Sequence, residues 1–343
     1  MELQEYLDSI EDEGRRSSIA GALDAVFECF EWDFISLPAD QRELNISVYE
    51  DDKVQALASE RARLIRFSTG LVKHYEQTRF PDITSLIPGA SFVLGANWVM
   101  DLGLTWSLSH EFVHIYRKHD SVEDAILAAS GATARVEARL QSAINLTQGS
   151  IQKALEHDAD LCAAAKIYRY IQRRCSKVVE DIILRKMALF YVYWGIRTLP
   201  ENSHGDSHPA MYERLYEITN KLAQVPTDFR APYIVGQDLD QQLKRAAVLA
   251  ELAMDLERAY IADSGQSEID AYWYKWFIHI NSRERTQRAK DWQKVSPWVE
   301  KISGTIADNR KDVFYYRQKS AEKIKGKKKI KRKSQRVARR NKR

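Results

Sequence analysis

Apolar residues recur at helical spacing near the start of the chain and predict an amphipathic helix there. The residues of this stripe are Ile19, Leu23, Val26, Phe27 and Phe30. The pattern then changes, because residues 43–49 (ELNISVY) alternate between polar and apolar, and residues 63–67 (RLIRF) favour strands. We therefore expect a small β-sheet within residues 43–70, with a helix beginning after the Ser-Thr-Gly sequence at 68–70.

Beyond residue 98 the apolar pattern is almost entirely helical. Helices are expected at residues 104–118, 121–129, 151–174, 178–199, 209–223 and 239–263. The aromatic segment 273–280 fits a helix and a buried strand equally well, and its rings are expected to serve a core or an interface. The pattern predicts an α+β protein, in which a small N-terminal β-sheet region packs on a predominantly helical body.

Charge is unevenly distributed along the 343 residues, of which 44% are hydrophobic. Residues 319–343 carry 14 Lys and Arg side chains and one acidic residue, Glu322, for a formal net charge of +13, whereas the rest of the chain is net −9. We expect a core at residues 1–225, a helical C-terminal extension at 226–318 and a disordered basic tail at 319–343. Helices 104–118 and 151–174 would carry the active site.

The cysteines and the apolar runs indicate the cellular compartment in which the protein is expected. Cys29, Cys162 and Cys175 cannot all pair and form no CxxC sequence, which is typical of a reducing environment. No run approaches the ~20 apolar residues of a membrane span. The acidic first residues, MELQEYLDSIEDEGRR, lack the layout of a signal peptide. We therefore expect a cytoplasmic protein with no membrane span.

An HExxH sequence at residues 110–114 is the clearest sign of chemistry. His110 and His114 are four residues apart, so both imidazoles lie on one helix face and can reach a single metal ion. Glu111 can then contact water at that ion. His119 follows on the same predicted helix but out of phase, so we expect it to be packed, or to support a ligand from behind, rather than to be a ligand itself. The alternative is two ordinary helix histidines beside a solvated glutamate.

A catalytic zinc site needs a third protein ligand. Residues 154–164 (ALEHDADLCAA) place Glu156 and Asp160 on one helix face, while Asp158 points elsewhere. The alanines of this segment would let its helix pack closely on the HExxH helix. Such a segment can supply one carboxylate to the metal and a second to the other N–H of a ligand histidine.

A third motif, Ser-His-Pro at 207–209, precedes a predicted helix and has Arg214 six residues after His208. HExxH, then ExxAD from Glu156 to Asp160, then SHP resembles the gluzincin zinc peptidases of the HtpX and CaaX-prenyl-protease type. A strand followed by Ser-Thr-Gly-Leu-Val, as at 68–72, also recurs in that group. The resemblance covers roughly residues 45–220.

The chain departs from these relatives in three respects. It has no spanning helix, Lys118 stands where a glycine usually precedes the next histidine, and Ala210 replaces the second proline of an SHPP pattern. A form without spanning helices resembles the bacterial Lit-type peptidases, a family linked to phage exclusion through cleavage of a host protein.

The resemblance implies a zinc endopeptidase that acts on an intracellular protein substrate. One zinc ion per chain would be held by His110, His114 and Glu156. Glu111 would be the general base, and His208 would donate to the scissile carbonyl. Asp160 would orient a ligand histidine, with Arg214 as a nearby charge. The site would lie in a cleft between the sheet and the helical body, where an edge strand at 63–67 or 91–94 could hold the substrate backbone.

The basic tail predicts binding to nucleic acid, to the ribosome or to another polyanion. It contains no aromatic residue, so binding should depend on charge and salt rather than on base stacking. The residues expected to bind are Lys327, Lys328, Lys329, Lys331, Arg332, Lys333, Arg339 and Arg340. The alternative function is therefore a nucleic-acid- or ribosome-associated binding protein with a structural or degenerate metal site. An intact Glu111 argues against it, because a structural site needs no base.

Overall fold

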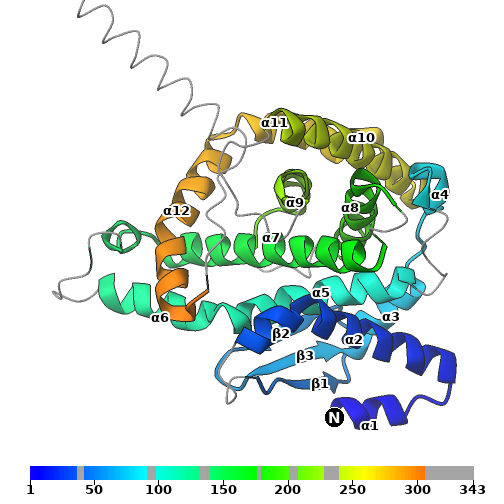
Figure 1. Cartoon of the computed structure of the whole chain (residues 1–343), viewed down its shortest axis with the longest axis horizontal. Coiled ribbons are helices and arrows are strands. Elements are labelled where there is room, and N and C mark those ends of the chain that lie inside the picture. The colour runs from blue at the N-terminus through cyan, green and yellow to red at the C-terminus, as the bar shows by residue number, and fades with distance from the viewer. Residues whose placement is uncertain are drawn as a thin grey trace, which may run out of the picture.

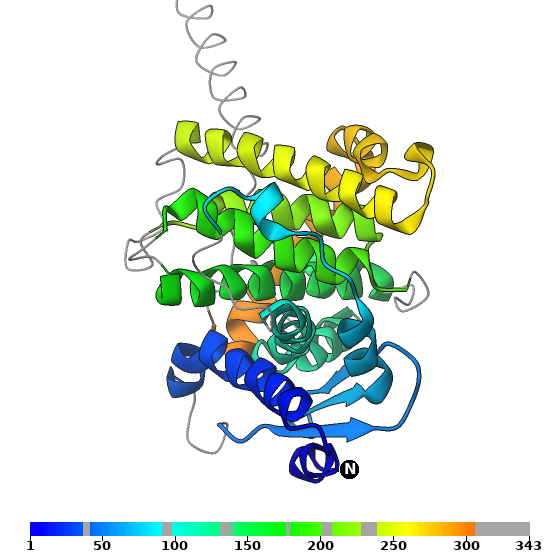
Figure 2. The ribbon, with the colours of Figure 1, turned by 90° about the vertical axis from the view of Figure 1, so that its right-hand side faces the viewer.

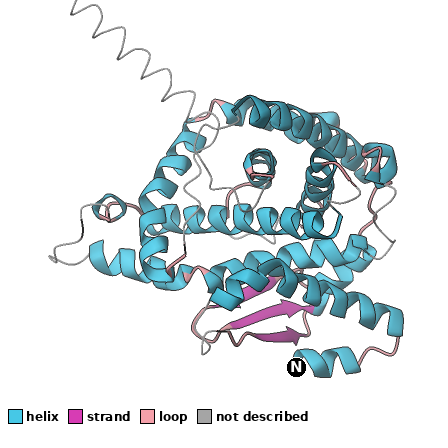
Figure 3. Ribbon diagram, in the orientation of Figure 1, coloured by secondary structure: helices cyan, strands magenta, loops and turns pink. Residues whose placement is uncertain are grey.

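The computed structural model describes residues 1–36, 42–90, 98–130, 137, 140–175, 179–200, 208–227 and 239–305 (Figure 1). The basic tail at 319–343, with its predicted disorder and its predicted polyanion-binding residues, lies outside these residues. A small sheet near the N-terminus packs on a mainly helical body, so the predicted α+β class is confirmed (Figure 3).

The sheet has three strands in the order β1-β3-β2, with bounds Asn45–Tyr49, Leu64–Ser68 and Ala56–Ser59. β3 pairs in parallel with β1 and antiparallel with β2. Alternation buries Ile65 and Phe67 of β3 on the face toward the helices. The predicted sheet region is confirmed, but the expectation of an edge at 63–67 is wrong, because β3 is paired on both sides. β2 is an edge instead, and residues 91–94 lie outside the described part.

The turn from β3 into helix α3 (Thr69–Gln77) follows the predicted Ser-Thr-Gly sequence. The Ser68 side chain caps the helix by accepting a hydrogen bond of 3.0 Å from the backbone N–H of Leu71. A Cβ on Gly70 would lie 2.5 Å from the backbone carbon and oxygen of Asp52. The chain can therefore make this turn against residue 52 only with glycine at position 70.

α5 is central to the N-terminal half, where it contacts α2, β2, α7 and α8. Figure 2 shows the sheet and α2 at one end of the molecule and α10 at the other. The bounds are α1 Leu3–Asp8, α2 Glu13–Ser36, α4 Ile83–Leu86, α5 Trp98–Tyr116 and α6 His119–Ser130. α5 is thus the layer between the sheet and the other helices, and it carries the HExxH sequence.

The other side of α5 is covered by α7 (Gln148–Cys175) and α8 (Asp181–Arg197). α9 (Met211–Gln224) and α10 (Leu239–Ser264) pack on these two in turn. Large side chains fill the space between them, including Trp106 of α5 and Trp194 of α8, both almost fully buried. The described residues contain no helix with the length and apolar content needed to cross a membrane.

The C-terminal helices close the body on two sides. The ambiguous segment is a helix, α11 (Tyr272–Ile280), joined by the short helix η5 (Glu268–Asp270) to α10. α12 (Arg283–Ser303) packs on α6, on α7 and on η3 (Gln141–Ala143). Trp292 and Trp298 of α12 form a second core cluster with Leu155 of α7. The aromatic segment itself contributes Trp276 to the main core, while Phe277 remains 76% exposed.

Candidate metal centre

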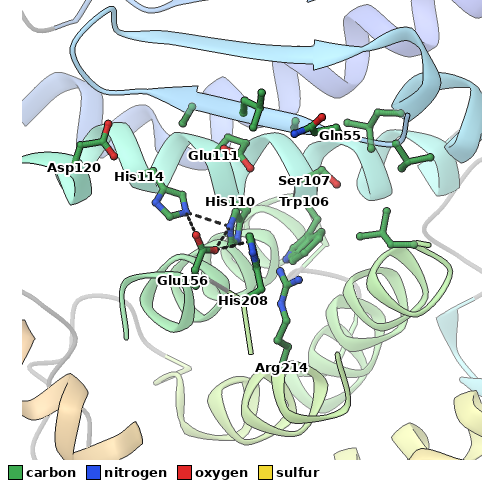
Figure 4. A pocket seen from close by; sticks show the side chains of 16 residues that line it. Gln55, Trp106, Ser107, His110, Glu111, His114, Asp120, Glu156, His208 and Arg214 are labelled. Carbon is green, nitrogen blue, oxygen red and sulfur yellow. Dashed lines mark hydrogen bonds and ion pairs between the residues drawn. The ribbon is translucent and has the colours of Figure 1, made fainter. Parts of the chain in front are cut away.

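Two histidines of α5 face the same space beside α7. His110 and His114 are one helical turn apart, and their Nε2 atoms lie 3.2 Å from each other (Figure 4). His110 is only 4% exposed. Two ring nitrogens converge in this way on a point that one ion can occupy.

Glu156 of α7 completes the group. Its Oε2 lies 3.1 Å from His110 Nε2, and its Oε1 lies 3.6 Å from His114 Nε2. α7 can approach α5 closely because Ala159 and Ala163 are fully buried between the helices. Ligands about 2.0 Å from zinc at tetrahedral angles are about 3.3 Å apart, which these separations match. The three side chains therefore have the donor types and the spacing to hold a zinc ion.

His110 is backed by a buried ion pair. Its Nδ1 lies 2.9 Å from Oδ1 of Asp160, although without the alignment of a regular hydrogen bond. Arg214 of α9 donates hydrogen bonds of 2.7 Å to both carboxylate oxygens of Asp160. Burial opposes the charge on Asp160, but Arg214 and His110 outweigh it and lower the pKa of the carboxyl group. An ionised Asp160 favours the His110 tautomer that carries its hydrogen on Nδ1 and leaves Nε2 free for a metal.

The neighbouring carboxylates raise the pKa values of both histidines in the metal-free protein. Burial disfavours protonation of His110, but Asp160 and Glu156 outweigh it and raise its pKa to about 10. Burial likewise opposes the charge on His114, and Glu156 raises the pKa above its usual value. The pKa of Glu156 is lowered, because these imidazoles overcome its own burial. The two histidines and Glu156 thus stabilise one another's charged forms in the metal-free state.

Glu111 follows His110 on α5 and stands on the side of the helix that faces β2 (Figure 4). No hydrogen bond or ion pair to its carboxylate is found within the described part of the chain. Burial raises the pKa of Glu111, and the neighbouring imidazoles of His110 and His114 oppose this. A carboxylate beside the candidate metal-binding histidines, and without a partner among the described residues, can accept a proton from water.

His208 enters from the chain just before α9. Its Nε2 lies 2.9 Å from Oε2 of Glu156, and its ring stacks beside that of His110 at a centroid distance of 6.0 Å. It is 22% exposed, so it can reach a molecule in the pocket. Arg214 on the following helix turns to Asp160 and lies over the ring of Trp106. His208 therefore contacts the centre through Glu156, whereas Arg214 contacts it through Asp160.

A pocket of about 400 Å³ opens over these side chains. One wall is the segment from Val54 to Ala58, which includes the start of the edge strand β2. The opposite wall holds the three side chains of the candidate metal site with Glu111, His208 and Arg214. The pocket lies between the sheet and the helical body, where the sequence placed it.

No family model, no curated protein and no solved structure matches this chain. The interpretation of the centre therefore depends on its own geometry.

His119 and Asp158 contact each other in the interior near the centre. His119 was expected to continue the HExxH helix, which is wrong, because α5 ends at Tyr116 and His119 begins α6. Lys118 between them has a φ of 54°, the left-handed conformation that glycine favours. His119 is packed, as expected, and burial lowers its pKa to about 4. Asp158 points away from the metal ligands, as expected, but it is buried against His119.

Proposed function

We propose that this chain is a zinc-dependent endopeptidase that hydrolyses a peptide bond in a cytoplasmic protein. The observation that carries the proposal is the convergence of His110, His114 and Glu156 in a pocket beside Glu111, whose carboxylate has no hydrogen bond or ion pair among the described residues. A structural site would need no free carboxylate and no pocket. The order of motifs shared with the gluzincin peptidases supports the same reaction.

Each side chain of the site has a distinct role in the proposed hydrolysis. A zinc ion, when bound, polarises the scissile carbonyl and makes water more acidic. Glu111 accepts a proton from the attacking water and returns it to the leaving amine. His208 donates to the oxygen on which negative charge develops, a contact worth about 3 kcal/mol at comparable sites. Asp160 and Arg214 keep the ring of His110 in place.

The edge of the sheet supports an extended peptide as substrate. β2 pairs with β3 on one side only and borders the pocket. An unpaired strand edge offers N–H and C=O groups in the spacing that another strand requires. A peptide added along β2 would lie beside Glu111, with every second carbonyl group directed away from β2. The substrate is therefore proposed to be an unfolded or looped segment of a protein.

The test compares the zinc-loaded protein with Glu111→Gln on a proteome-derived peptide library, with new N-termini read by mass spectrometry. Wild type should create new N-termini, whereas Glu111→Gln should retain zinc and lose nearly all cleavage. Glu251→Gln, at an exposed position on α10, is the matched control and should cleave as wild type does. Equal cleavage by Glu111→Gln would show that this residue is not the general base. Absence of cleavage by the zinc-loaded wild type would contradict the proposed peptidase activity.

A second function is favoured by the +13 charge of residues 319–343. We propose that this tail holds the protein on nucleic acid, on the ribosome or on another polyanion. The two functions are compatible if the tail brings the peptidase to its substrates. The resemblance to Lit-type peptidases makes phage exclusion, through cleavage of a host protein, the biological setting to examine.

A further inference from the structure

A second chain of buried polar contacts leads away from the metal centre. Nδ1 of His114 lies 3.1 Å from Nδ1 of His119, and Nε2 of His119 lies 3.2 Å from Oδ2 of Asp158. Arg117 then contacts both oxygens of Asp158 at 2.6 Å. His119, Asp158 and Arg117 are 1%, 3% and 6% exposed. Each of these polar groups therefore relies on its neighbours rather than on water.

The contact between Nδ1 of His114 and Nδ1 of His119 determines which nitrogen of each ring carries a hydrogen. His114 faces the other metal-binding atoms with Nε2, so its hydrogen belongs on Nδ1 when a metal is bound. That hydrogen can be donated to Nδ1 of His119, which must then carry its own hydrogen on Nε2. The Nε2 hydrogen points at Asp158, an acceptor. The contacts thus form one directed series of donors and acceptors, with no conflict at any atom.

The break between α5 and α6 makes this contact possible. Residues five apart on one continuous helix do not face each other. Here α5 ends at Tyr116, Lys118 takes the left-handed conformation, and α6 starts at His119. The two imidazole rings consequently meet edge to face, with centroids 4.8 Å apart and planes at 90°.

We propose that His119 and Asp158 are positioning residues that hold His114 in its metal-binding orientation. The arrangement repeats the one at His110, whose Nδ1 faces Asp160 and through it Arg214. Each metal-binding histidine is thus backed by an Asp–Arg pair whose aspartate comes from α7. For His114 an added imidazole bridges the longer distance. The inference rests on the proposed metal site, since it concerns how that site binds its ion.

The test is the zinc affinity of purified variants, measured by competition with a chromophoric chelator. His119→Phe keeps the ring but removes both hydrogen bonds, and it should bind zinc about 10–100-fold more weakly. His119→Gln offers one acceptor and one donor and should recover most of the affinity. The absorption bands of the Co²⁺-substituted protein should shift in His119→Phe and return toward wild type in His119→Gln.

Val122→Ala is the matched control, because Val122 is fully buried on the same helix and packs in the second core. It should lower the melting temperature and leave zinc affinity unchanged. Wild-type affinity and Co²⁺ bands in a folded His119→Phe would overturn the inference, and so would an equal loss in Val122→Ala. If His119→Phe does not fold, Asp158→Asn should weaken zinc binding in the same direction, and an unchanged affinity there would overturn it.

The experiment separates this inference from the proposed function. Zinc bound by wild type and held more weakly by His119→Phe supports the positioning role even if no peptide is cleaved. Cleavage by wild type with unchanged zinc affinity in His119→Phe and Asp158→Asn removes the positioning role and leaves the peptidase. A wild-type protein that binds no zinc would remove both.

Discussion

Arg214 and Asp160 form a two-point ion pair in the interior, with Nε and Nη2 of the arginine each 2.7 Å from a carboxylate oxygen. Arg214 is 3% exposed and Asp160 is 2% exposed. One partner belongs to α9 and the other to α7, and Asp160 in turn faces His110. This pair therefore joins the helix after the SHP motif to a ligand of the candidate metal centre.

Removal of one partner of the Arg214–Asp160 ion pair should strongly lower the stability of the protein. Arg214→Met leaves Asp160 buried without its counter-charge and should lower the free energy of unfolding by about 3–5 kcal/mol. Arg258→Met removes an exposed partner of Asp255 and should cost less than about 1 kcal/mol. Urea denaturation of both variants checks the difference. Equal losses would show that the buried pair contributes no more than a surface pair.

The zinc content should depend on His110 and not on other histidines. His110→Ala removes one of three ligands and should reduce the zinc content from about one per chain to near zero. His74→Ala changes a histidine of α3 that contacts Thr78 and Thr198 outside the centre, and it should keep its zinc. Elemental analysis after dialysis measures both. Full zinc content in His110→Ala would contradict the ligand assignment.

Zinc binding should weaken as the pH falls. The pKa of His110 in the metal-free protein is raised to about 10, so this ring carries a proton at neutral pH that zinc must displace. Zinc affinity should therefore rise with pH by about tenfold per unit for each displaced proton, and level off above the raised pKa. Calorimetry in two buffers with different ionisation heats counts the protons released. Affinity constant between about pH 6 and 8 would contradict the contacts of His110 with Asp160 and Glu156.

Helix α5 depends on a glycine where it meets α3. A Cβ on Gly103 would lie 2.7 Å from two ring carbons of Tyr75, whose hydroxyl is 2.8 Å from Ser107 Oγ. Gly103→Ala should therefore destabilise the protein by about 1–3 kcal/mol through overpacking. Gly149→Ala on α7 meets no atom within 4 Å and should be neutral or stabilising by up to about 1 kcal/mol. Thermal unfolding compares the two, and equal melting temperatures would contradict the tight contact at Tyr75.

The basic tail should bind polyanions through charge alone. Full-length protein should bind a random single-stranded RNA with an affinity that falls steeply with salt, because each neutralised phosphate releases counterions. The chain that ends at residue 318 should bind at least about tenfold more weakly at low salt. Filter binding across a salt series measures both proteins. Equal affinity after truncation, or affinity independent of salt, would exclude the tail as the binding element.

Local patterns predicted most of the elements. The alternation at 43–49, the Ser-Thr-Gly cap and the long helical stripes each depend on neighbouring residues, and each appears in the structure. Strand order is different, since it depends on long-range pairing. The sequence therefore named the strand at 63–67 without showing that β1 and β2 flank it.

In the candidate site, too, local spacing was easier to predict than contacts between distant segments. The spacing of His110 and His114 places them together through helix geometry alone, while Glu156 was linked to them by the need for a third ligand, by the small residues around it and by motif resemblance. The break at Lys118 could not be read from residue types, because lysine rarely adopts positive φ. Without that break His119 could not be placed against His114, nor Asp158 against His119.

The packing of α12 has a consequence for the order in which the protein is made. Trp292 and Trp298 cover Leu155, the residue next to Glu156, yet they follow it by more than a hundred positions. During synthesis a nascent chain holds every proposed metal ligand long before it holds the helix that buries this part of α7. The centre is therefore supported fully only when translation has passed α12.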